Sequence, residues 1–233
     1  MLECLPQMKG AKFPDEAVMR FFFKEHLDKT PGSVVEFGCG TANNLLMLFA
    51  AYGYDVVGVD RSDEALSKAY DNATVAGADM DKIGFLKSDI AKPIAYQCGV
   101  IGPMDVIMFP GIIYYLQRDD VPPMLSQVNE GCGKLGSWIF VRARGMGDYR
   151  LNQGNRVNKN TSALTTNEAG EAGCLNVCYH EWELVDMFRS AFDLDMDTLR
   201  VMHIHFENRM MFTDPAGVQM LNHDIVLYGR KKV

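Results

Sequence analysis

A short apolar segment that ends in two closely spaced glycines places the strongest constraint on this chain. Residues 33–37 are rich in β-branched and aromatic side chains and predict a buried strand, which Gly38 and Gly40 follow directly. A helix is expected over residues 44–49, and a second strand over residues 55–60 ends on Asp60. Glycines at such a turn let the backbone approach a ligand, and a carboxylate about 20 residues further on can accept ribose hydroxyls. The pattern predicts a nucleotide-type site at one edge of a parallel sheet.

The alternation of short strands and helical segments continues along the chain. Helices are expected from Pro14, after Ser62, over residues 119–130 and after His180, and further strands at about residues 83–86, 105–109, 138–142, 199–206 and 224–228. Such alternation is typical of an α/β fold in which helices cover both faces of a parallel sheet. A length of 233 residues with 48% apolar side chains fits a single domain over residues 1–233.

The segment 144–178 departs from this alternation. It is polar, rich in Gly and Asn, and without clear periodicity, so we expect a long loop there. The loop would follow the fifth strand and therefore begin at the edge of the sheet where α/β proteins bind ligands. Connections of this length are usually functional or mobile. A lid or substrate-binding insertion is expected, with a plain surface loop as the alternative.

The charge and the cysteine pattern exclude several functional classes. The net charge is -7 without a long Lys/Arg run, which makes a nucleic-acid partner unfavourable. The six cysteines form no Cys-x-x-Cys pair, so free thiols and a cytoplasmic location are expected. No apolar stretch is long enough to cross a membrane. His203 and His205 share one strand face, but no convincing third ligand stands near them in the sequence, so no metal site is expected.

Position 43 bears on which nucleotide the site binds. A dinucleotide fingerprint needs a third glycine there, because that glycine lets the helix pack closely while a pyrophosphate sits on its N-terminus. This chain has Asn43 instead. S-adenosylmethionine contains no pyrophosphate, so the missing glycine favours it over a nicotinamide dinucleotide.

Four segments resemble the motifs of class I S-adenosylmethionine-dependent methyltransferases. They are Val35-Glu36-Phe37-Gly38-Cys39-Gly40-Thr41, Val57-Gly58-Val59-Asp60-Arg61-Ser62, Leu86-Lys87-Ser88-Asp89-Ile90, and residues 104–116. The resemblance covers about residues 12–142 and departs at Ala42, where many members have glycine. It implies a Rossmann-like, doubly wound sheet of seven strands, mostly parallel, with a reversed C-terminal hairpin.

The resemblance also implies which residues bind S-adenosylmethionine. Asp60 is expected to accept the ribose hydroxyls, and Glu36 to contact the cofactor's amino group. Asp89 or its neighbours would hold the adenine amine, although Asp89 could instead cap the turn that follows it. The complete expected set is Glu36, Gly38, Cys39, Gly40, Asn44, Asp60, Arg61, Ser88, Asp89, Ile90 and Phe109.

The expected reaction is methyl transfer to a small polar or anionic metabolite, with O, N, S or C as the acceptor atom. The arginines of segment 144–178 suit such a substrate, because guanidinium groups match carboxylates and phosphates. A neutral acceptor also needs a proton acceptor nearby. The expected substrate-binding residues are Tyr114, Tyr115, Arg144 and Arg150, and the expected catalytic residues are Tyr149 and His180. His180 could instead be the N-cap of the helix that follows it.

The start of the chain resembles a narrower group. Residues 13–21 are similar to the opening helix of a bacterial small-molecule branch of the family, in which Tyr-Pro-x-Glu is usual and Phe13 replaces the tyrosine. That branch is largely uncharacterised and supplies no substrate. Two alternatives stay open, a non-catalytic S-adenosylmethionine-binding partner protein and a nicotinamide-dependent oxidoreductase. The sequence does not specify an oligomeric state.

Overall fold

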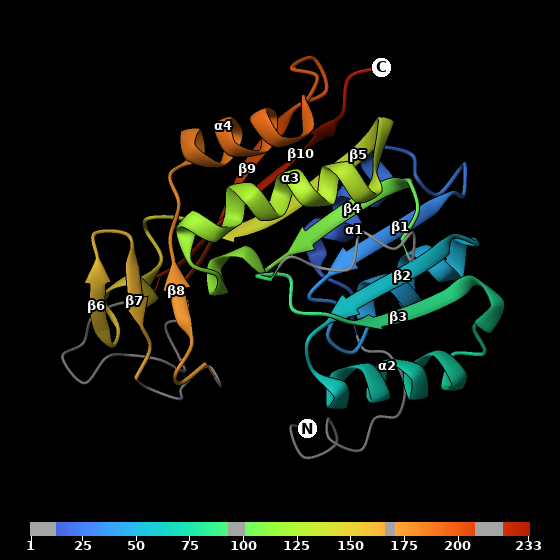
Figure 1. The fold of residues 1–233 in the computed structure, drawn as a ribbon, viewed down its shortest axis with the longest axis horizontal. Coiled ribbons are helices and arrows are strands. Elements are labelled where there is room, and N and C mark those ends of the chain that lie inside the picture. The colour runs from blue at the N-terminus through green and yellow to red at the C-terminus, as the bar shows by residue number, and fades with distance from the viewer. Residues whose placement is uncertain (1–12, 93–100, 166–170, 208–220) are drawn as a thin grey trace.

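The centre of the molecule is a seven-stranded sheet (Figure 1), and the computed structural model describes residues 13–92, 101–165, 171–207 and 221–233. Its strands are β1 (Ser33–Phe37), β2 (Asp55–Asp60), β3 (Ile83–Lys87), β4 (Met104–Pro110), β5 (Gly133–Arg144), β9 (Arg200–Glu207) and β10 (Leu221–Arg230). They lie in the order β3-β2-β1-β4-β5-β10-β9. The first five strands in this order, β3, β2, β1, β4 and β5, are all parallel to their neighbours. β10 is antiparallel to both β5 and β9. The expected mostly parallel α/β sheet with a reversed C-terminal pair is confirmed.

Helices cover both faces of this sheet (Figure 1). They are α1 (Glu16–Lys24), α2 (Asp63–Val75), α3 (Val121–Cys132) and α4 (Glu181–Phe192), with the π-helix η2 (Leu45–Phe49) and the 3-10 turns η3 (Ala50–Tyr52), η4 (Met80–Lys82), η6 (Ile113–Tyr115), η7 (Arg118–Asp120) and η8 (Tyr149–Asn152). α1, η2 and α2 bury their apolar side chains in one core, and α3 and α4 in the other. On the α1 face, Phe21 contacts Trp138, Phe140 and Tyr228 with ring centroids 5.0–5.7 Å apart.

Local sequence signals set most helix ends. The carboxylate of Asp15 accepts from the backbone N–H of Ala17 and Val18, so Asp15 is the N-cap of α1 and the helix begins later than Pro14. Ser62 caps α2 in the same way, as expected. The helix expected over residues 44–49 is present, but it is a π-helical turn rather than an α-helix. Gly53 ends that segment with φ +87°, a conformation that favours glycine.

Strand boundaries follow the sequence pattern closely for β1 and β2 and less closely for β5 and β10. β5 begins at Gly133, well before residue 138, because Gly133 pairs with Met104 of β4. β10 extends from Leu221 to Arg230 because it pairs along its whole length with β5 or β9. Glycine and many polar residues have a low propensity for strands, so the sequence pattern does not predict these strand ends. Hydrogen bonds to the neighbouring strands compensate for that low propensity.

The segment after β5 is more ordered than expected. It contains η8 and a small antiparallel sheet of β6 (Asn155–Asn158), β7 (Thr161–Ala163) and β8 (Leu175–Val177), which lies beside the main sheet (Figure 1). Gly145 forms a bridge to Tyr179, and Tyr179 N–H donates to the carbonyl of Arg144 at 2.8 Å. The excursion 145–179 therefore leaves and rejoins the main fold at one place. Within the residues that the structure describes, no helix is both long and apolar enough to span a membrane.

Candidate active site

A cleft of about 260 Å³ opens at the carboxyl ends of β1, β2 and β4, and we call it the cofactor cleft. Parallel α/β sheets bind ligands at this edge, where the strand order reverses on either side of β1. The cleft is lined by Gly38, Val59, Asp60, Arg61, Ser88, Asp89, Ile90, Gly111, Ile112, Tyr115 and Leu116. The structure thus brings together residues of three separate sequence motifs.

The glycine turn after β1 forms one wall of the cofactor cleft. Gly38 has φ +72°, and a Cβ atom there would come within 2.9 Å of the Ile112 side chain. Gly40 has φ +53° and open space around it, so glycine is favoured there because of the backbone conformation and not because a side chain would clash. Ala42 is buried and also has a positive φ of +62°. That conformation explains why many members of the family resembled here have glycine at the position of Ala42.

Asp60 ends β2 with its carboxylate directed at two backbone N–H groups. One oxygen accepts from Gly40 and the other from Ser62, each at 2.9 Å. These bonds fix the carboxylate at the mouth of the glycine turn. A carboxylate has about four lone-pair positions, so two remain for hydroxyl donors of a ligand.

Asp89 has two roles in the structure. It lines the cofactor cleft together with Ser88 and Ile90. Its carboxylate also accepts from Ala91 N–H at 3.2 Å and lies 3.5 Å from Lys92. The turn-capping alternative for Asp89 is therefore observed alongside its place in the cleft.

A chain of polar contacts runs from β1 to the start of α1 and on to β10. Asn44 donates to Glu36 at 2.8 Å and accepts from the backbone N–H of Asp15 at 2.7 Å. The Asp15 carboxylate pairs with Arg142 of β5, and Arg142 also pairs with Asp224 of β10. Burial alone would lower the pKa of Arg142, but Asp15 and Asp224 raise it, so Arg142 stays charged.

Glu36 is the buried end of this chain. Burial raises its pKa to about 8, with the nearby carboxylates of Asp15 and Asp60 adding to the effect and the bond from Asn44 opposing it. Among the described residues, its Oε2 atom has no hydrogen-bond partner. A buried oxygen of this kind fits an ammonium donor, which the amino group of S-adenosylmethionine provides. The residues present therefore fit this cofactor, whose ribose Asp60 would bind and whose amino group Glu36 would bind.

A second hollow of about 340 Å³ lies on the same edge, and we call it the acceptor hollow. Tyr115 lines the cofactor cleft and Tyr114 lines the acceptor hollow, and their rings are 4.5 Å apart. The two cavities thus adjoin the same tyrosine pair. The acceptor hollow is lined by Tyr114, Arg144, Arg150, Phe206, Asn222 and Asp224.

Both arginines of the acceptor hollow are paired within the protein. Arg144 is buried, lies 4.0 Å over the Tyr114 ring and bonds Asn176 and Glu171. Arg150 contacts Asp148 at 3.1 Å and Glu171 at 3.0 Å. Burial raises the pKa of Glu171, but the bond from Tyr115 and the two arginines lower it below its usual value. Sequence reasoning missed Glu171, because a single glutamate in a polar segment gives no signal of its partners.

The remaining predicted residues lie in different surroundings. Tyr149 lies under Arg150, with the guanidinium 4.7 Å from the ring. His180 is the exposed N-cap residue of α4 and stacks on Trp182. The side chain of Phe109 is in the core, stacked on Phe37. The Cys39 thiol is buried facing Gly58, where a Cβ would come within 2.7 Å of it. The cleft-lining residues that sequence reasoning missed are Val59, Gly111, Ile112 and Leu116.

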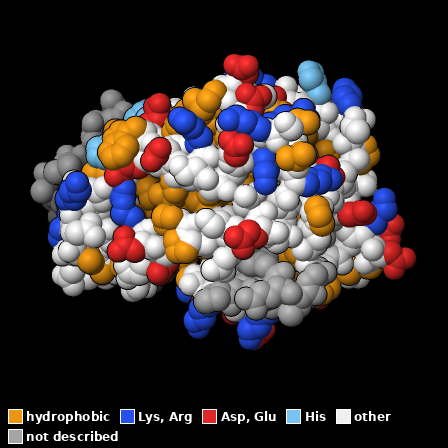
Figure 2. Space-filling model, turned by 45° about the horizontal axis from the view of Figure 1, so that its top comes forward, with side chains coloured by type: hydrophobic (Ala, Val, Ile, Leu, Met, Phe, Trp, Pro, Cys, Tyr) orange, Lys and Arg blue, Asp and Glu red, His pale blue; other side chains and the backbone are white. Residues whose placement is uncertain are grey.

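The surface carries mixed charge on the face shown in Figure 2, where acidic and basic side chains are interspersed. A surface that binds nucleic acid through its phosphates usually presents clustered Lys and Arg. This face lacks such a cluster among the side chains in view.

Comparison with known proteins agrees with this geometry. Residues 34–136 match the family model described as a methyltransferase domain. Three uncharacterised methyltransferases of Schizosaccharomyces pombe are 27% identical over 117 residues, which is 50% of this chain and 74% of each relative. A Methanosarcina mazei S-adenosylmethionine-dependent methyltransferase superposes with a TM-score of 0.64 at 17% identity over 90% of this chain and 97% of that chain.

A second solved structure carries the demethylated cofactor. The Burkholderia thailandensis 1,6-didemethyltoxoflavin-N1-methyltransferase, with S-adenosylhomocysteine bound, superposes with a TM-score of 0.59 at 18% identity over 94% of this chain and 80% of that chain. The matched family region contains the glycine turn, Asp60 and Asp89. The family match over residues 34–136 and the cofactor cleft support the interpretation of the chain as a class I S-adenosylmethionine-dependent methyltransferase, and the solved structures show that it shares their fold.

Proposed function

We propose that this enzyme transfers the methyl group of S-adenosylmethionine, bound in the cofactor cleft, to a small polar molecule bound in the acceptor hollow. The observation that carries the proposal is the shared Tyr114–Tyr115 pair, which adjoins both cavities. The bound cofactor supplies an electrophilic methyl group. The protein's part is to align the acceptor and to exclude water, and the excursion 145–179 lies where it can cover the hollow.

The charge around the acceptor hollow favours a polar substrate over an anionic one. Arg142, Arg144 and Arg150 face the carboxylates of Asp15, Asp148, Glu171 and Asp224 in the ion pairs described above. These arginines are neutralised before any ligand enters. A carboxylate or phosphate substrate would have to displace Glu171 or Asp224, whereas a neutral molecule can bond the amide of Asn222, whose oxygen accepts from Arg150, without breaking an ion pair.

Tyr149 fits a positioning role better than that of a base. Burial raises its pKa, Arg150 opposes that rise, and the net result lies above the usual value of a phenol. Tyr149 therefore keeps its proton near neutral pH and can donate a hydrogen bond to an acceptor atom. The named substrate of the Burkholderia enzyme, 1,6-didemethyltoxoflavin, supports the general class of small-molecule acceptor for this fold.

The test of the acceptor site follows S-adenosylhomocysteine formation with a panel of small neutral and anionic compounds. Replacing Arg150 by Ala removes its contacts to Asp148 and Glu171, so turnover should fall on the order of tenfold to a hundredfold while cofactor affinity stays within about twofold. Arg200→Ala is the matched control, because Arg200 bonds backbone carbonyls at the far end of β9. Equal turnover in the two variants would place the acceptor outside this hollow.

The test of the cofactor cleft is Asp60→Ala. The change removes a charged acceptor of two ribose hydroxyls, each bond being worth about 1.5–3 kcal/mol. Calorimetry should show binding of S-adenosylmethionine weakened on the order of a hundredfold or more. Asp55→Ala, at the opposite and exposed end of the same strand, should leave it unchanged. Unaltered affinity in Asp60→Ala would remove the ribose assignment.

A further inference from the structure

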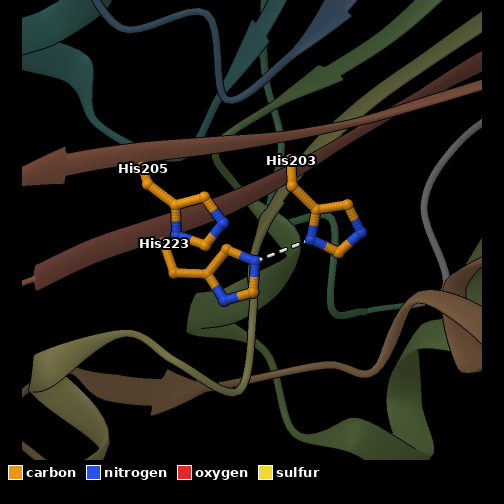
Figure 3. Close-up of side chains that lie close together, drawn as sticks. All are labelled: His203, His205 and His223. Atoms are coloured by element: carbon orange, nitrogen blue, oxygen red, sulfur yellow. Dashed lines mark hydrogen bonds between the residues drawn. The ribbon is translucent and has the colours of Figure 1, made fainter.

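Three histidines from two neighbouring strands gather at the excursion's attachment point (Figure 3). His205 of β9 pairs directly with His223 of β10, and His203 lies two residues from His205 on the same strand face. Each offers a ring nitrogen, and these nitrogens all lie within 4.8 Å of one another. We propose that His203, His205 and His223 form a binding site for a divalent transition metal of the zinc type.

The cluster is separate from the acceptor hollow. Asn222, Asp224 and Phe206 line that hollow, and side chains alternate between faces along a strand. His223 and His205 therefore point to the other face of the sheet, toward α4. His203 contacts Glu181 at the first position of α4, which confirms this placement.

Hydrogen bonds prepare His203 as a ligand. Its Nε2 lies 2.7 Å from the Glu181 carboxylate, which accepts only, so Nε2 carries the proton. That fixes the tautomer and leaves the Nδ1 lone pair directed at His223, 2.8 Å away. A carboxylate that holds the far nitrogen of an imidazole in this way is the usual outer partner of a metal-binding histidine.

His223 links the cluster to the start of the excursion. Its Nδ1 accepts from Gly147 N–H at 3.0 Å, so without metal its proton is on Nε2 and is donated to His203. Binding of a metal through Nε2 moves that proton to Nδ1 and breaks the bond from Gly147. Because Gly145 and Gly147 have no Cβ, the His223 ring packs directly on this turn. Metal loading therefore releases a contact at the point where the excursion leaves β5.

The donor set selects the class of metal. Neutral imidazoles suit Zn²⁺, Cu²⁺ and Ni²⁺, whereas Mg²⁺ and Ca²⁺ prefer oxygen ligands. Zinc–nitrogen distances of about 2.0–2.1 Å place two ligand nitrogens of a tetrahedral site roughly 3.3 Å apart. The hydrogen bond of 2.8 Å between His203 Nδ1 and His223 Nε2 would therefore open slightly as the ion enters between them. The rings of His205 and His223 are stacked at 4.4 Å, and the exposed side chains of His203 and His205 have room to turn toward a shared ion.

The test titrates untagged, chelator-treated protein with Zn²⁺ by calorimetry and with Co²⁺ by visible absorption. One equivalent should bind, with a Co²⁺ spectrum typical of nitrogen ligands. His203→Gln and His205→Gln should each weaken binding on the order of a hundredfold, and Glu181→Gln about tenfold to a hundredfold. His26→Asn is the control, because it removes an exposed histidine from the turn after α1 and asparagine tolerates its positive φ.

A second readout does not depend on the variants. In the ¹⁵N spectrum of the wild-type protein, the Gly147 amide resonance should shift on addition of one equivalent of Zn²⁺, and it should not shift with Mg²⁺. The proposal is overturned if Zn²⁺ binding is unchanged in His203→Gln and His205→Gln, as it would be if the thiols bound the metal. It is equally overturned if the Gly147 resonance stays in place at saturation.

Discussion

Glu36 combines a buried carboxyl group with an oxygen that has no hydrogen-bond partner among the described residues. Its pKa of about 8 means that the folded protein holds a proton there at neutral pH, whereas the unfolded chain releases it above about 4.5. Because the folded-state value is raised, folding stability falls as the pH rises from 4.5 to about 8 and is flat above that. The residue thus costs stability at neutral pH, which is typical of a ligand-binding position.

Glu36→Gln should remove this pH dependence. The amide cannot ionise and still accepts the bond from Asn44, so the variant should gain stability relative to the wild type as the pH rises toward 8, by a few kcal/mol at most. Urea unfolding at several pH values measures the difference. Glu130→Gln, on the exposed side of α3, is the control and should show a constant difference. A constant difference in Glu36→Gln as well would contradict the raised pKa.

At the scale of elements, α1 is attached to the active-site edge through its N-cap. Asp15 caps the helix, pairs with Arg142, and through its backbone N–H positions Asn44, which in turn bonds Glu36. The amphipathic face of α1 buries Phe21 and Phe22 against the sheet. The middle of α1 therefore stabilises the fold by packing, and its first residues support the cofactor cleft.

The Asp15→Ala variant should distinguish the packing role of α1 from its role in supporting the cofactor cleft. Loss of the cap costs about 0.5–2 kcal/mol of folding stability, and loss of the Arg142 contact should weaken S-adenosylmethionine binding several-fold. The control is Asp79→Ala, which removes a similar capping carboxylate from η4 at the opposite edge of the sheet. Thermal unfolding and calorimetry distinguish the effects: both variants should lose stability, and only Asp15→Ala should lose affinity. Equal affinities would mean that α1 serves packing alone.

The elements also show where the sequence was informative. β1, β2 and α2 depend on local patterns and caps, and the limits of β1 and β2 and the start of α2 agree with the prediction. β6 was missed because all its residues are exposed, so no alternation of apolar and polar residues marks it. The sequence analysis did not identify His223 as a third histidine of the cluster. His223 lies near His205 because β10 pairs with β9, and the spacing of residues along the sequence does not reveal that pairing.

At the scale of the whole molecule, the excursion 145–179 is joined to the main fold where Gly145 bridges Tyr179. A segment whose two ends meet can move as a unit with little change elsewhere. Glu171 on this segment pairs with Arg144 of β5, so an ion pair also holds the excursion against the main sheet. We propose that the excursion acts as a lid that responds to a molecule in the acceptor hollow.

Amide exchange should show that response. With S-adenosylhomocysteine and an acceptor both present, the amides of β7 and β8 should exchange more slowly than with S-adenosylhomocysteine alone, because a filled hollow holds the excursion closed. The amides of β1 and β4 serve as the internal control and should not differ between the two conditions. Equal exchange of β7 and β8 in both conditions would argue against a lid.

The position of β10 between β5 and β9 has a consequence for biosynthesis. Residues 221–230 must emerge from the ribosome before β9 can join the sheet, since β9 reaches it only through β10. Until then β5 presents an unpaired edge that includes the apolar run from Trp138 to Val141. Exposed strand edges of this kind promote aggregation of incomplete chains. A nascent chain stalled before Leu221 is therefore left with an open sheet, and protection of that edge by a chaperone would matter most during the last stage of translation of this segment.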